Sequence, residues 1–372
     1  MKILYINGSR IPTDRAHGIQ IMKMCSAFTY SRISVALWVP RRFNYTKQDP
    51  FEYYGMKRNF LIRKIPCIDL IPLTRFFGPA SLWITELSFL LFVICCLSFV
   101  KADAIYTRDK FVAFFLSFFI KNIFFEAHDV PSRLFFLRFQ TIGGIIAITQ
   151  NLKNEFVKRG ISAKKIIIAP DGVDLNEFNI PQSQEECRKR LGLPLDKKIV
   201  LYTGHLYPWK GVGTLLAAAQ VSSMLFVLVG GTEKDTAEFR RKAEKLKNVI
   251  IVGHKPHGEI AHWLKAADVL ILPNSEKYVI SKYWTSPMKL FEYMASGRPI
   301  VASDLPSLRE ILNHNNAKFA KPDNPESFAR AIQLAFDNAE ESARLAARAR
   351  EDVQMYTWEK RAEKIWQLFH RK

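Results

Sequence analysis

The chain has 372 residues, 48% of them hydrophobic, which predicts about two domains with large buried cores and argues against disordered and fibrous classes. Lysine and arginine outnumber acidic residues by 54 to 35, and the net charge of +19 favours an anionic partner such as a phosphate-bearing substrate or anionic lipid. No helix-turn-helix, zinc-knuckle or RNP-type motif accompanies this charge, so we expect no nucleic-acid partner.

Short apolar runs alternate with longer helical segments along the chain, which is typical of parallel sheets built from βαβ units. In the first half, strands are predicted over 3–7, 34–39, 104–107, 123–126, 145–149 and 166–169, and helices over 17–30, 82–100, 110–120 and 151–159. After a turn-rich passage from Pro170 to Pro194, strands are predicted over 199–203, 225–229, 249–252, 269–272 and 300–302. Helices are predicted near 210–221, 234–246, 257–267, 287–296, 305–313, 325–355 and 359–370.

This rhythm divides the chain into two doubly wound α/β domains, joined near residues 180–195. We place the first domain at 1–185 and the second at 186–355. The closing segment, 356–372, forms an amphipathic helix that is either an ordinary terminal helix or one that packs back on the first domain.

Aromatic residues concentrate in the first half, where residues 1–185 hold 21 of the 28 phenylalanines. The stretch 32–75 carries nine Lys/Arg against three Asp/Glu, interleaved with Phe43, Tyr45, Phe51, Tyr53, Tyr54 and Phe60. Basic residues beside exposed rings suit an anionic membrane surface, although a basic loop with its rings folded inward has the same pattern. The apolar runs 87–100 and 111–120 are shorter than the roughly 20 residues that span a bilayer, so we expect peripheral attachment.

The amino-terminal segment resembles a buried strand ending at Gly8, and its apolar run is too short for a signal peptide. The five cysteines show no CxxC or Cys/His metal spacing, which favours free thiols in a reducing compartment. We therefore expect a cytoplasmic protein on the inner face of the cell membrane.

Open parallel sheets bind ligands beyond the carboxyl ends of their strands, so the loops after the strands are the first candidates for a site. Gly18 follows the first strand and gives a phosphate or sugar access to the backbone, although a simple turn explains it equally well. The absence of GxGxxG argues against a dinucleotide-dependent oxidoreductase. His128 and Asp129 follow a strand and can orient a substrate hydroxyl or steady developing charge, the alternative being a structural histidine.

In the second half, a loop from Gly204 to Gly213 follows a strand and opens a helix. Its Lys210 offers a positive charge to a diphosphate leaving group. Ser286 and the amides after it stand at a predicted helix start that suits phosphate. Glu292, on that helix, can accept hydrogen bonds from both hydroxyls of a ribose, the alternative being an ordinary surface acid.

Together these segments resemble the family 4 retaining glycosyltransferases of the GT-B fold, in the glycosyl transferases group 1 superfamily. The matching segments are the Gly18 loop, His128-Asp129, Ile148-Thr149 with Asn151-Leu152, Pro170 to Asp174, Gly204 to Gly213, Gly253, Ala267 to Pro273, and Lys289 to Asp304. The resemblance implies two Rossmann-like domains facing across a cleft, with an acceptor-binding domain at 1–185 and a nucleotide-sugar-binding domain at 186–355. It also implies that the segment 356–372 packs back on the first domain.

The resemblance assigns a role to each matched residue. Glu292 matches the acid that grips the nucleotide ribose, and Lys210 matches the cation on the donor diphosphate. His128 matches the histidine that assists catalysis near the sugar C6, so His128, Lys210 and Glu292 form the expected catalytic set. The residues expected to bind the donor are Gly18, Gly204, His205, Lys210, Ser286, Pro287, Met288, Lys289, Leu290 and Glu292.

The implied mechanism is a same-face substitution in which the leaving diphosphate helps to deprotonate the acceptor hydroxyl. It needs neither a metal nor a cofactor, which agrees with the lack of an Asp-x-Asp motif here. The expected substrates are a nucleotide sugar, with uridine the commonest base, and a lipid-linked or cell-surface glycan acceptor.

Two positions depart from the family pattern. Trp284 stands where many relatives have a glutamate, eight residues before the ribose acid, with Glu276 as a possible replacement from the same loop. His205 stands where an arginine usually precedes the phosphate lysine. Two alternatives therefore stay open: a sugar-nucleotide 2-epimerase of the same fold, which needs paired acids that the sequence does not reveal, and a membrane-docked nucleotide-sugar-binding protein without turnover.

Overall fold

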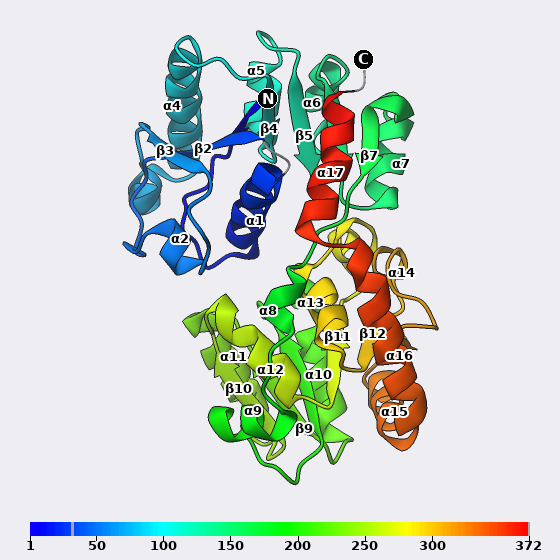
Figure 1. Ribbon diagram of the computed structural model, residues 1–372. Coiled ribbons are helices and arrows are strands. Elements are labelled where there is room, and N and C mark those ends of the chain that lie inside the picture. Colours follow the sequence, from blue (N-terminus) through cyan, green and yellow to red (C-terminus); the bar gives the residue numbers. More distant parts are fainter. Residues whose placement is uncertain (31–32, 371–372) are drawn as a thin grey trace. The chain divides into compact units, whose positions relative to one another are not determined.

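The computed structural model describes residues 1–30 and 33–370, and the chain divides into two compact units. Unit 1 comprises Met1–Pro170 together with the chain from Trp358 onward, and unit 2 comprises Asp171–Thr357 (Figure 1). Residues 31–32 and 371–372, which fall in the predicted first domain and the predicted closing segment, lie outside the described residues.

Unit 1 is built on a seven-stranded parallel sheet with the order β3-β2-β1-β4-β5-β6-β7. Its strands are β1 (Lys2–Ile6), β2 (Ser34–Pro40), β3 (Leu61–Ile65), β4 (Ala104–Thr107), β5 (Ile123–Ala127), β6 (Gly144–Ala147) and β7 (Ile166–Ile168). From β1 the order runs outward to β2 in one direction and to β4 in the other, so the carboxyl ends of β1 and β4 form a topological switch point.

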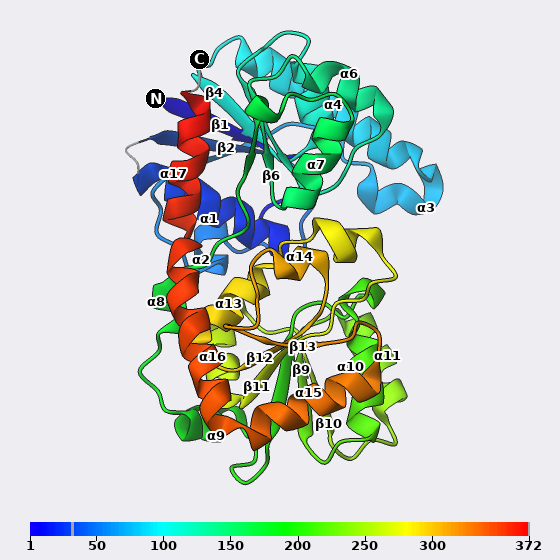
Figure 2. The same cartoon turned by 90° about the vertical axis from the view of Figure 1, so that its right-hand side faces the viewer.

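The helices of unit 1 are α1 (Ala16–Tyr30), α2 (Pro50–Tyr53), α3 (Thr74–Phe77), α4 (Ala80–Leu97), α5 (Lys110–Leu116), α6 (Arg133–Phe139), α7 (Gln150–Lys158) and α17 (Trp358–Phe369), with short 3-10 turns η1 (Ile71–Leu73) and η2 (Ala163–Lys165). Helix α17 packs beside α1 and β6 (Figure 2). Its Phe369 ring lies 4.3 Å, between centroids, from the ring of Phe124 on β5. The last helix of the chain is therefore part of the first unit's core.

Unit 2 is built on a six-stranded parallel sheet with the order β10-β9-β8-β11-β12-β13. Its strands are β8 (Ile199–Thr203), β9 (Leu225–Val229), β10 (Val249–Gly253), β11 (Val269–Leu272), β12 (Ile300–Ser303) and β13 (Lys318–Ala320). The direction of winding reverses between β8 and β11, which pair directly with each other. The loops after these two strands are therefore neighbours at a second switch point.

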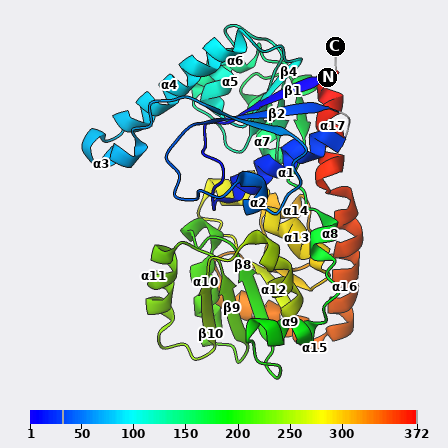
Figure 3. The ribbon, with the colours of Figure 1, turned by 60° about the vertical axis from the view of Figure 1, so that its left-hand side comes forward.

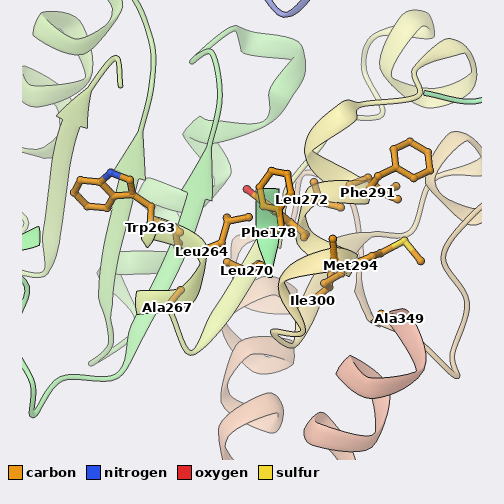
Figure 4. Close-up of a cluster of buried hydrophobic side chains, with 14 of the residues drawn as sticks. Phe178, Trp263, Leu264, Ala267, Leu270, Leu272, Phe291, Met294, Ile300 and Ala349 are labelled. Carbon is orange, nitrogen blue, oxygen red and sulfur yellow. The ribbon is translucent and has the colours of Figure 1, made fainter. Parts of the chain in front are cut away.

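The helices of unit 2 are α8 (Leu175–Phe178), α9 (Gln184–Leu191), α10 (Val212–Gln220), α11 (Glu233–Ala243), α12 (Ile260–Ala266), α13 (Met288–Ser296), α14 (Pro306–Arg309), α15 (Pro325–Asp337) and α16 (Ala339–Asp352). Shorter turns are η3 (Pro208–Lys210), η4 (His257–Glu259), the π-helical η5 (Ile280–Trp284) and η6 (Val353–Met355). One core cluster joins Leu270 of β11, Phe291 and Met294 of α13, and Ala349 of α16 (Figure 4). Burying a leucine or phenylalanine side chain contributes roughly 1.5–3 kcal/mol, so this cluster anchors α13 to its sheet.

The boundary between the units lies at Pro170–Asp171, rather than between the predicted domains 1–185 and 186–355. The amide of Val173 donates to the carbonyl of Tyr356 at 3.0 Å, and Phe178 is buried in the core of unit 2. These contacts draw residues 171–185 into the second unit. Residues 356–357 also belong to unit 2, and the return to unit 1 begins at Trp358.

The strands and helices that were not predicted are β3, β13, α2, α3, α6, α8 and α9, together with the break that divides 325–355 into α15 and α16. Strand β3 lies at one edge of its sheet, and β13 lies at one edge of the other sheet. An edge strand has one solvated side, so it tolerates the charges of the sequence Leu-Ile-Arg-Lys-Ile in β3 and lacks the continuous apolar run of a central strand. At Asn338 the backbone leaves helical geometry, with φ −108° and ψ 64°, and ends α15.

Helix α4 begins at Ala80, seven residues before the charge-free run 87–100. The run begins only after Glu86, but the helix continues through that residue. It has 18 residues and a mean hydropathy of 2.1, so it is long and apolar enough to cross a membrane by length and composition alone, and only 28% of it is buried. The prediction that the apolar segment at 87–100 is too short to span a bilayer was therefore wrong about the length of the helix that contains it. Figure 3 shows α3 and α4 along one side of unit 1.

The aromatic residues of the stretch 32–75 do not form one surface. Phe43 and Tyr45 are 56% and 77% exposed, but Phe51 and Tyr54 are buried. The Tyr54 hydroxyl donates to the carbonyl of Thr13 at 2.8 Å. Part of the predicted basic and aromatic surface is therefore folded inward.

Candidate functional site

The loops that follow β8 and β11 meet at the switch point of unit 2. Gly211 ends η3 with φ 71°, and a Cβ atom there would lie 1.8 Å from the carbonyl oxygen of Pro273, just beyond β11. Only glycine allows this approach. The amide of Ser275 then donates to the carbonyl of Trp209 at 3.1 Å. These contacts fix Lys210, which stands between Trp209 and Gly211.

Lys210 carries a desolvated ammonium group at this position. Its Nζ lies 3.8 Å from the ring centroid of Trp209. Burial lowers the pKa of Lys210 to about 7, and the negative charge of Asp171 opposes the shift. An ammonium held in such a setting is stabilised by an anionic ligand, as expected for a group that binds diphosphate.

Asp171 links Ser286 to Lys210, because it contacts Ser286 and acts electrostatically on Lys210. The amide of Asp171 donates to Ser286 Oγ at 3.0 Å, and the charge of Asp171 acts on Lys210. Ser286 precedes α13, whose first-turn amides point out of the helix start. Asp171 belongs to the matched segment Pro170 to Asp174, but sequence reasoning gave it no role.

Glu292 lies farther along α13, with its side chain 10% exposed. His257 Nε2 lies 3.0 Å from Glu292 Oε1, and His257 Nδ1 lies 3.9 Å from a carboxylate oxygen of Glu177. His257 was missed by the sequence analysis, although it lies in the loop after β10 where ligand-binding residues are expected. Its imidazole can hold the Glu292 carboxylate in place, so Glu292 is more than an ordinary surface acid.

The other residues predicted to bind the donor differ in what they offer. The His205 ring stacks on Tyr207, with centroids 4.9 Å apart. Pro287 and Met288 start α13 as predicted, with Pro287 at the N-cap. Leu290 does not fit the prediction: its side chain is buried in the core and its amide donates to the carbonyl of Pro287 at 2.8 Å. Leu290 therefore stabilises the helix start.

The two family departures on the loop after β11 occupy defined positions. Trp284 ends the π-helical turn η5. Glu276, the candidate replacement acid, lies 3.3 Å from Lys282 Nζ in an ion pair and is held through its amide by Asp323. The position of Glu276 is therefore set by contacts within the loop after β11 and with Asp323, and not by helix α13.

In unit 1, His128 follows β5 and contacts a buried acid. Glu126, which is 0% exposed, has Oε1 at 2.6 Å from His128 Nε2. Gln20 of α1 donates to the same oxygen at 2.5 Å, and the hydroxyl of Tyr106 donates to Oε2. Sequence reasoning singled out His128 but missed the carboxylate that holds it.

Arg361 of α17 completes this cluster. Its guanidinium lies 3.0 Å from Glu126 Oε2, and its Nε donates to the carbonyl of Pro170 at 2.8 Å. Burial alone would raise the pKa of Glu126, but the charge of Arg361 and the bond from His128 hold it well below the usual value. Glu126 is therefore ionised, and His128 donates to it through Nε2–H.

Gly18 lies in the first turn of α1, within the predicted helix 17–30. A Cβ atom on Gly18 would lie 2.1 Å from the Tyr54 hydroxyl and 2.6 Å from the Thr13 methyl group. Packing against Tyr54 explains why a glycine is needed here, and it fills the side of the residue that a ligand was predicted to approach.

A pair of carboxyl groups lies at the switch point of unit 1. A Cβ atom on Gly8 would lie 2.4 Å from an oxygen of Asp109 and 2.9 Å from an oxygen of Glu86. Burial, with the nearby charge of Asp109, raises the pKa of Glu86 to about 7. Burial also raises the pKa of Asp109, although hydrogen bonds from the backbone amides of Val112, Phe111 and Gly8 act in the opposite direction. The sequence had revealed no such pair, because its members come from distant segments.

Among residues 1–30 and 33–370, no three His, Cys, Asp or Glu side chains are grouped as a metal site. Metal independence stays a prediction.

Comparison with known proteins finds a family match within the second unit. Residues 183–352 match the model of the family Glycosyl transferases group 1. This part of the chain is similar to the group 1 glycosyltransferases. Lys210, Ser286 and Glu292 lie within the matched range, whereas Asp171 and His128 lie outside it.

One similar curated protein is TuaC of Bacillus subtilis (strain 168), named a putative teichuronic acid biosynthesis glycosyltransferase. It is 28% identical over 192 residues, which cover 50% of this chain and 45% of TuaC. The aligned part of this chain spans about half the length of the curated relatives it matches.

Solved structures resemble the whole chain. Sucrose-phosphate synthase from Thermosynechococcus elongatus matches with a TM-score of 0.79 and 20% identity, over 99% of this chain and 98% of the other. Anabaena HepE in complex with UDP-glucose matches with a TM-score of 0.76 and 19% identity, over 99% and 98% of the two chains. These likenesses confirm the predicted GT-B fold of two parallel-sheet α/β domains.

Proposed function

We propose that this protein is a retaining glycosyltransferase that transfers a sugar from a nucleotide sugar to a lipid-linked or cell-surface glycan acceptor. The observations that support the proposal are that Asp171 links Ser286 to Lys210, and that Lys210 and Glu292 both act electrostatically on Lys289. Lys210, Ser286, Lys289 and Glu292 all lie in the segment that matches the group 1 glycosyltransferase model. The UDP-glucose bound to the structurally similar HepE supports a uridine-linked donor.

In the proposed reaction, Glu292 accepts hydrogen bonds from the ribose hydroxyls, and Lys210 with the helix start at Ser286 binds the diphosphate. The acceptor oxygen bonds to the anomeric carbon on the face from which the diphosphate leaves. The bond from that carbon to the phosphate oxygen breaks, and the acceptor proton passes to the leaving phosphate. No metal takes part, because Lys210 and the α13 amides offset the charge of the leaving group.

His128 is the residue proposed to assist catalysis from unit 1. Its bond to the ionised Glu126 fixes the ring and places a proton on Nε2. Glu126 is thus a positioning residue for His128. An imidazole held in one orientation loses less entropy when it contacts a substrate than a free one does.

We propose that the acceptor is reached at the inner face of the cell membrane, with α4 as the main contact. Trp83, Leu87 and Leu91 of α4 are about half exposed, and Phe76 before it is 79% exposed. A helix with a largely apolar sequence that is mostly unburied in the protein suits contact with lipid. The net charge of +19 favours an anionic bilayer, and TuaC is named for the synthesis of a cell-surface polymer.

A sugar-nucleotide 2-epimerase is the second candidate, because the Glu86–Asp109 pair supplies a carboxyl group whose pKa of about 7 suits proton transfer. An epimerase would act on the donor alone, whereas a transferase needs an acceptor. A binding protein without turnover is the remaining alternative and would use the same donor site.

One assay distinguishes the three. The protein is incubated with a panel of nucleotide sugars, with and without a lipid extract, and both free nucleoside diphosphate and sugar identity are measured. Diphosphate release that depends on the lipid extract supports transfer, and an interconverted sugar supports epimerisation. Binding without either product would contradict both enzyme functions. Lys210→Met should abolish release, and Glu340→Gln, an exposed substitution on α16, serves as the matched control.

A further inference from the structure

Lys289, the second residue of α13, has a buried ammonium group without a hydrogen-bond partner among the described residues. The residue is only 8% exposed, and its Nζ lies 3.7 Å from the ring centroid of Tyr202 on β8. An ammonium has three donors, and leaving all of them unpaired away from water is unfavourable. A site that keeps such a group is therefore completed by a ligand.

The surroundings of Lys289 fix where that ligand binds. A Cβ atom on Gly204, whose φ is 121°, would lie 3.0 Å from Lys289 Nζ. Gly204 thus leaves the room that the ammonium needs at the end of β8. One turn along α13, the hydroxyl of Tyr293 accepts from the amide of Thr203 at 2.8 Å. Helix α13 is therefore held with Lys289 against the loop that leads to Lys210.

The charges around Lys289 indicate an anion. Burial, followed by the positive charge of Lys210, holds the pKa of Lys289 well below its usual value, and Glu292 only partly opposes this. No carboxylate of the described residues lies within ion-pair distance of Lys289, since Glu292 contacts His257 instead. Two desolvated ammonium groups near each other favour a ligand with at least two negative charges.

We propose that the Lys289 side chain binds the diphosphate of the donor together with Lys210, in place of the arginine that the family usually has at position 205. The resemblance placed Lys289 among the residues expected to bind the donor but gave its side chain no role. It rests on the proposed nucleotide-sugar function. His205 stacks on Tyr207, and Lys289 supplies the second positive charge that an arginine at position 205 would bring.

Diphosphate binding at the two lysines should change how many protons the protein holds. Both lysines have lowered pKa values without the anion, and a bound diphosphate raises them because an opposite charge favours the protonated form. Binding of a diphosphate therefore takes up protons from solution above neutral pH. A lysine that only supported the fold would not produce this uptake.

The test is calorimetric titration with UDP, uridine and inorganic pyrophosphate at pH 8, in two buffers of different ionisation enthalpy. Lys289→Met should weaken UDP and pyrophosphate binding by about tenfold or more and reduce the proton uptake, because a charge-assisted hydrogen bond is lost. Uridine binding should stay unchanged. His205→Ala should change UDP binding by less than about threefold, and Lys234→Met, an exposed lysine on α11, is the matched control.

Three outcomes are distinguishable. UDP affinity in Lys289→Met within about twofold of wild type, or equal weakening of uridine and UDP, would overturn the role of Lys289 while leaving the proposed function standing. Failure of the wild type to bind UDP, ADP, GDP or pyrophosphate would overturn the proposed function itself. Misfolding is checked by the urea midpoint, which we expect to rise in Lys289→Met, because the substitution removes a buried amino group without a hydrogen-bond partner among the described residues.

Discussion

Glu126 of β5 and Arg361 of α17 form a buried ion pair with 3.0 Å between Oε2 and the guanidinium, although they come from opposite halves of the chain. The same carboxylate contacts His128. The last helix of the chain is therefore bonded to the strand that presents the predicted catalytic histidine, and the docking of α17 and the orientation of His128 depend on one acid.

The ion pair predicts strong coupling between the two residues. Glu126→Gln and Arg361→Met should each destabilise unit 1 by about 3–5 kcal/mol, because each leaves one buried charge unpaired. The double variant should lose much less than the sum. Hydrogen exchange of the amides in β5 and α17 measures this within unit 1, and Arg348→Met, which breaks exposed pairs on α16, is the control. Additive losses would show that the pair is not coupled.

The same acid predicts loss of stability in acid. The folded-state pKa of Glu126 is depressed, so its contribution is complete above the unfolded-state value near 4.5 and is lost as the pH falls through the lower folded-state value. Stability of wild-type unit 1 should therefore fall more steeply below pH 4.5 than that of Glu126→Gln. Exchange protection of β5 measured from pH 6 to pH 3 tests this, and parallel curves would contradict it.

Lys210 predicts a pH dependence of the opposite kind. Its folded-state pKa of about 7 lies below the usual 10.5, so between these values the unfolded chain binds more protons than the folded one. Stability of unit 2 should therefore rise with pH across this interval. In Lys210→Met the rise should be smaller and stability at pH 7 higher. Urea denaturation at pH 7 and pH 10 measures both, and a variant less stable than wild type at pH 7 would refute the desolvated state of Lys210.

The proposed role of Glu292 predicts that its substitution weakens UDP binding without lowering the stability of the protein. Glu292→Ala should weaken UDP binding by about tenfold or more, because hydrogen bonds from ribose hydroxyls to a charged group are lost. Binding of inorganic pyrophosphate should be unaffected, which separates the ribose from the phosphates. Calorimetric titration of both ligands gives the answer, with Glu340→Gln as control. Unchanged UDP affinity would refute the ribose assignment.

Helix α4 predicts membrane binding through its exposed side. Leu87→Glu and Leu91→Glu, at positions 48% and 61% exposed, should each reduce binding to anionic phosphatidylglycerol vesicles by about tenfold, because burial of a leucine contributes roughly 1.5–3 kcal/mol. Leu334→Glu, 45% exposed on α15 of unit 2, should have no effect. Vesicle flotation measures binding, and chromatography shows whether the wild type instead self-associates. Equal flotation of all variants would exclude α4 as the contact.

The sequence predicted the central strands well because each is a short, continuous apolar run buried on both faces. It missed the edge strands β3 and β13, whose short sequences Leu-Ile-Arg-Lys-Ile and Lys-Phe-Ala include charged residues. The apolar edge strands β7 and β10 were predicted. The loops at Lys210 and Ser286 were predicted because ligand residues follow strands in this fold class, and the same rule would have found His257.

By itself, the sequence determined the fold class, the two-sheet organisation and the residues at the strand ends, because apolar periodicity and glycine-rich turns are local properties of the chain. Only the tertiary structure decided that Asp171 meets Ser286 and that Glu126 holds both His128 and Arg361. It also decided that the Lys289 ammonium has no hydrogen-bond partner among the described residues. These contacts join segments that are far apart in the sequence. The burial that shifts the pKa values of Glu126, Lys210 and Lys289 exists only once the chain has folded.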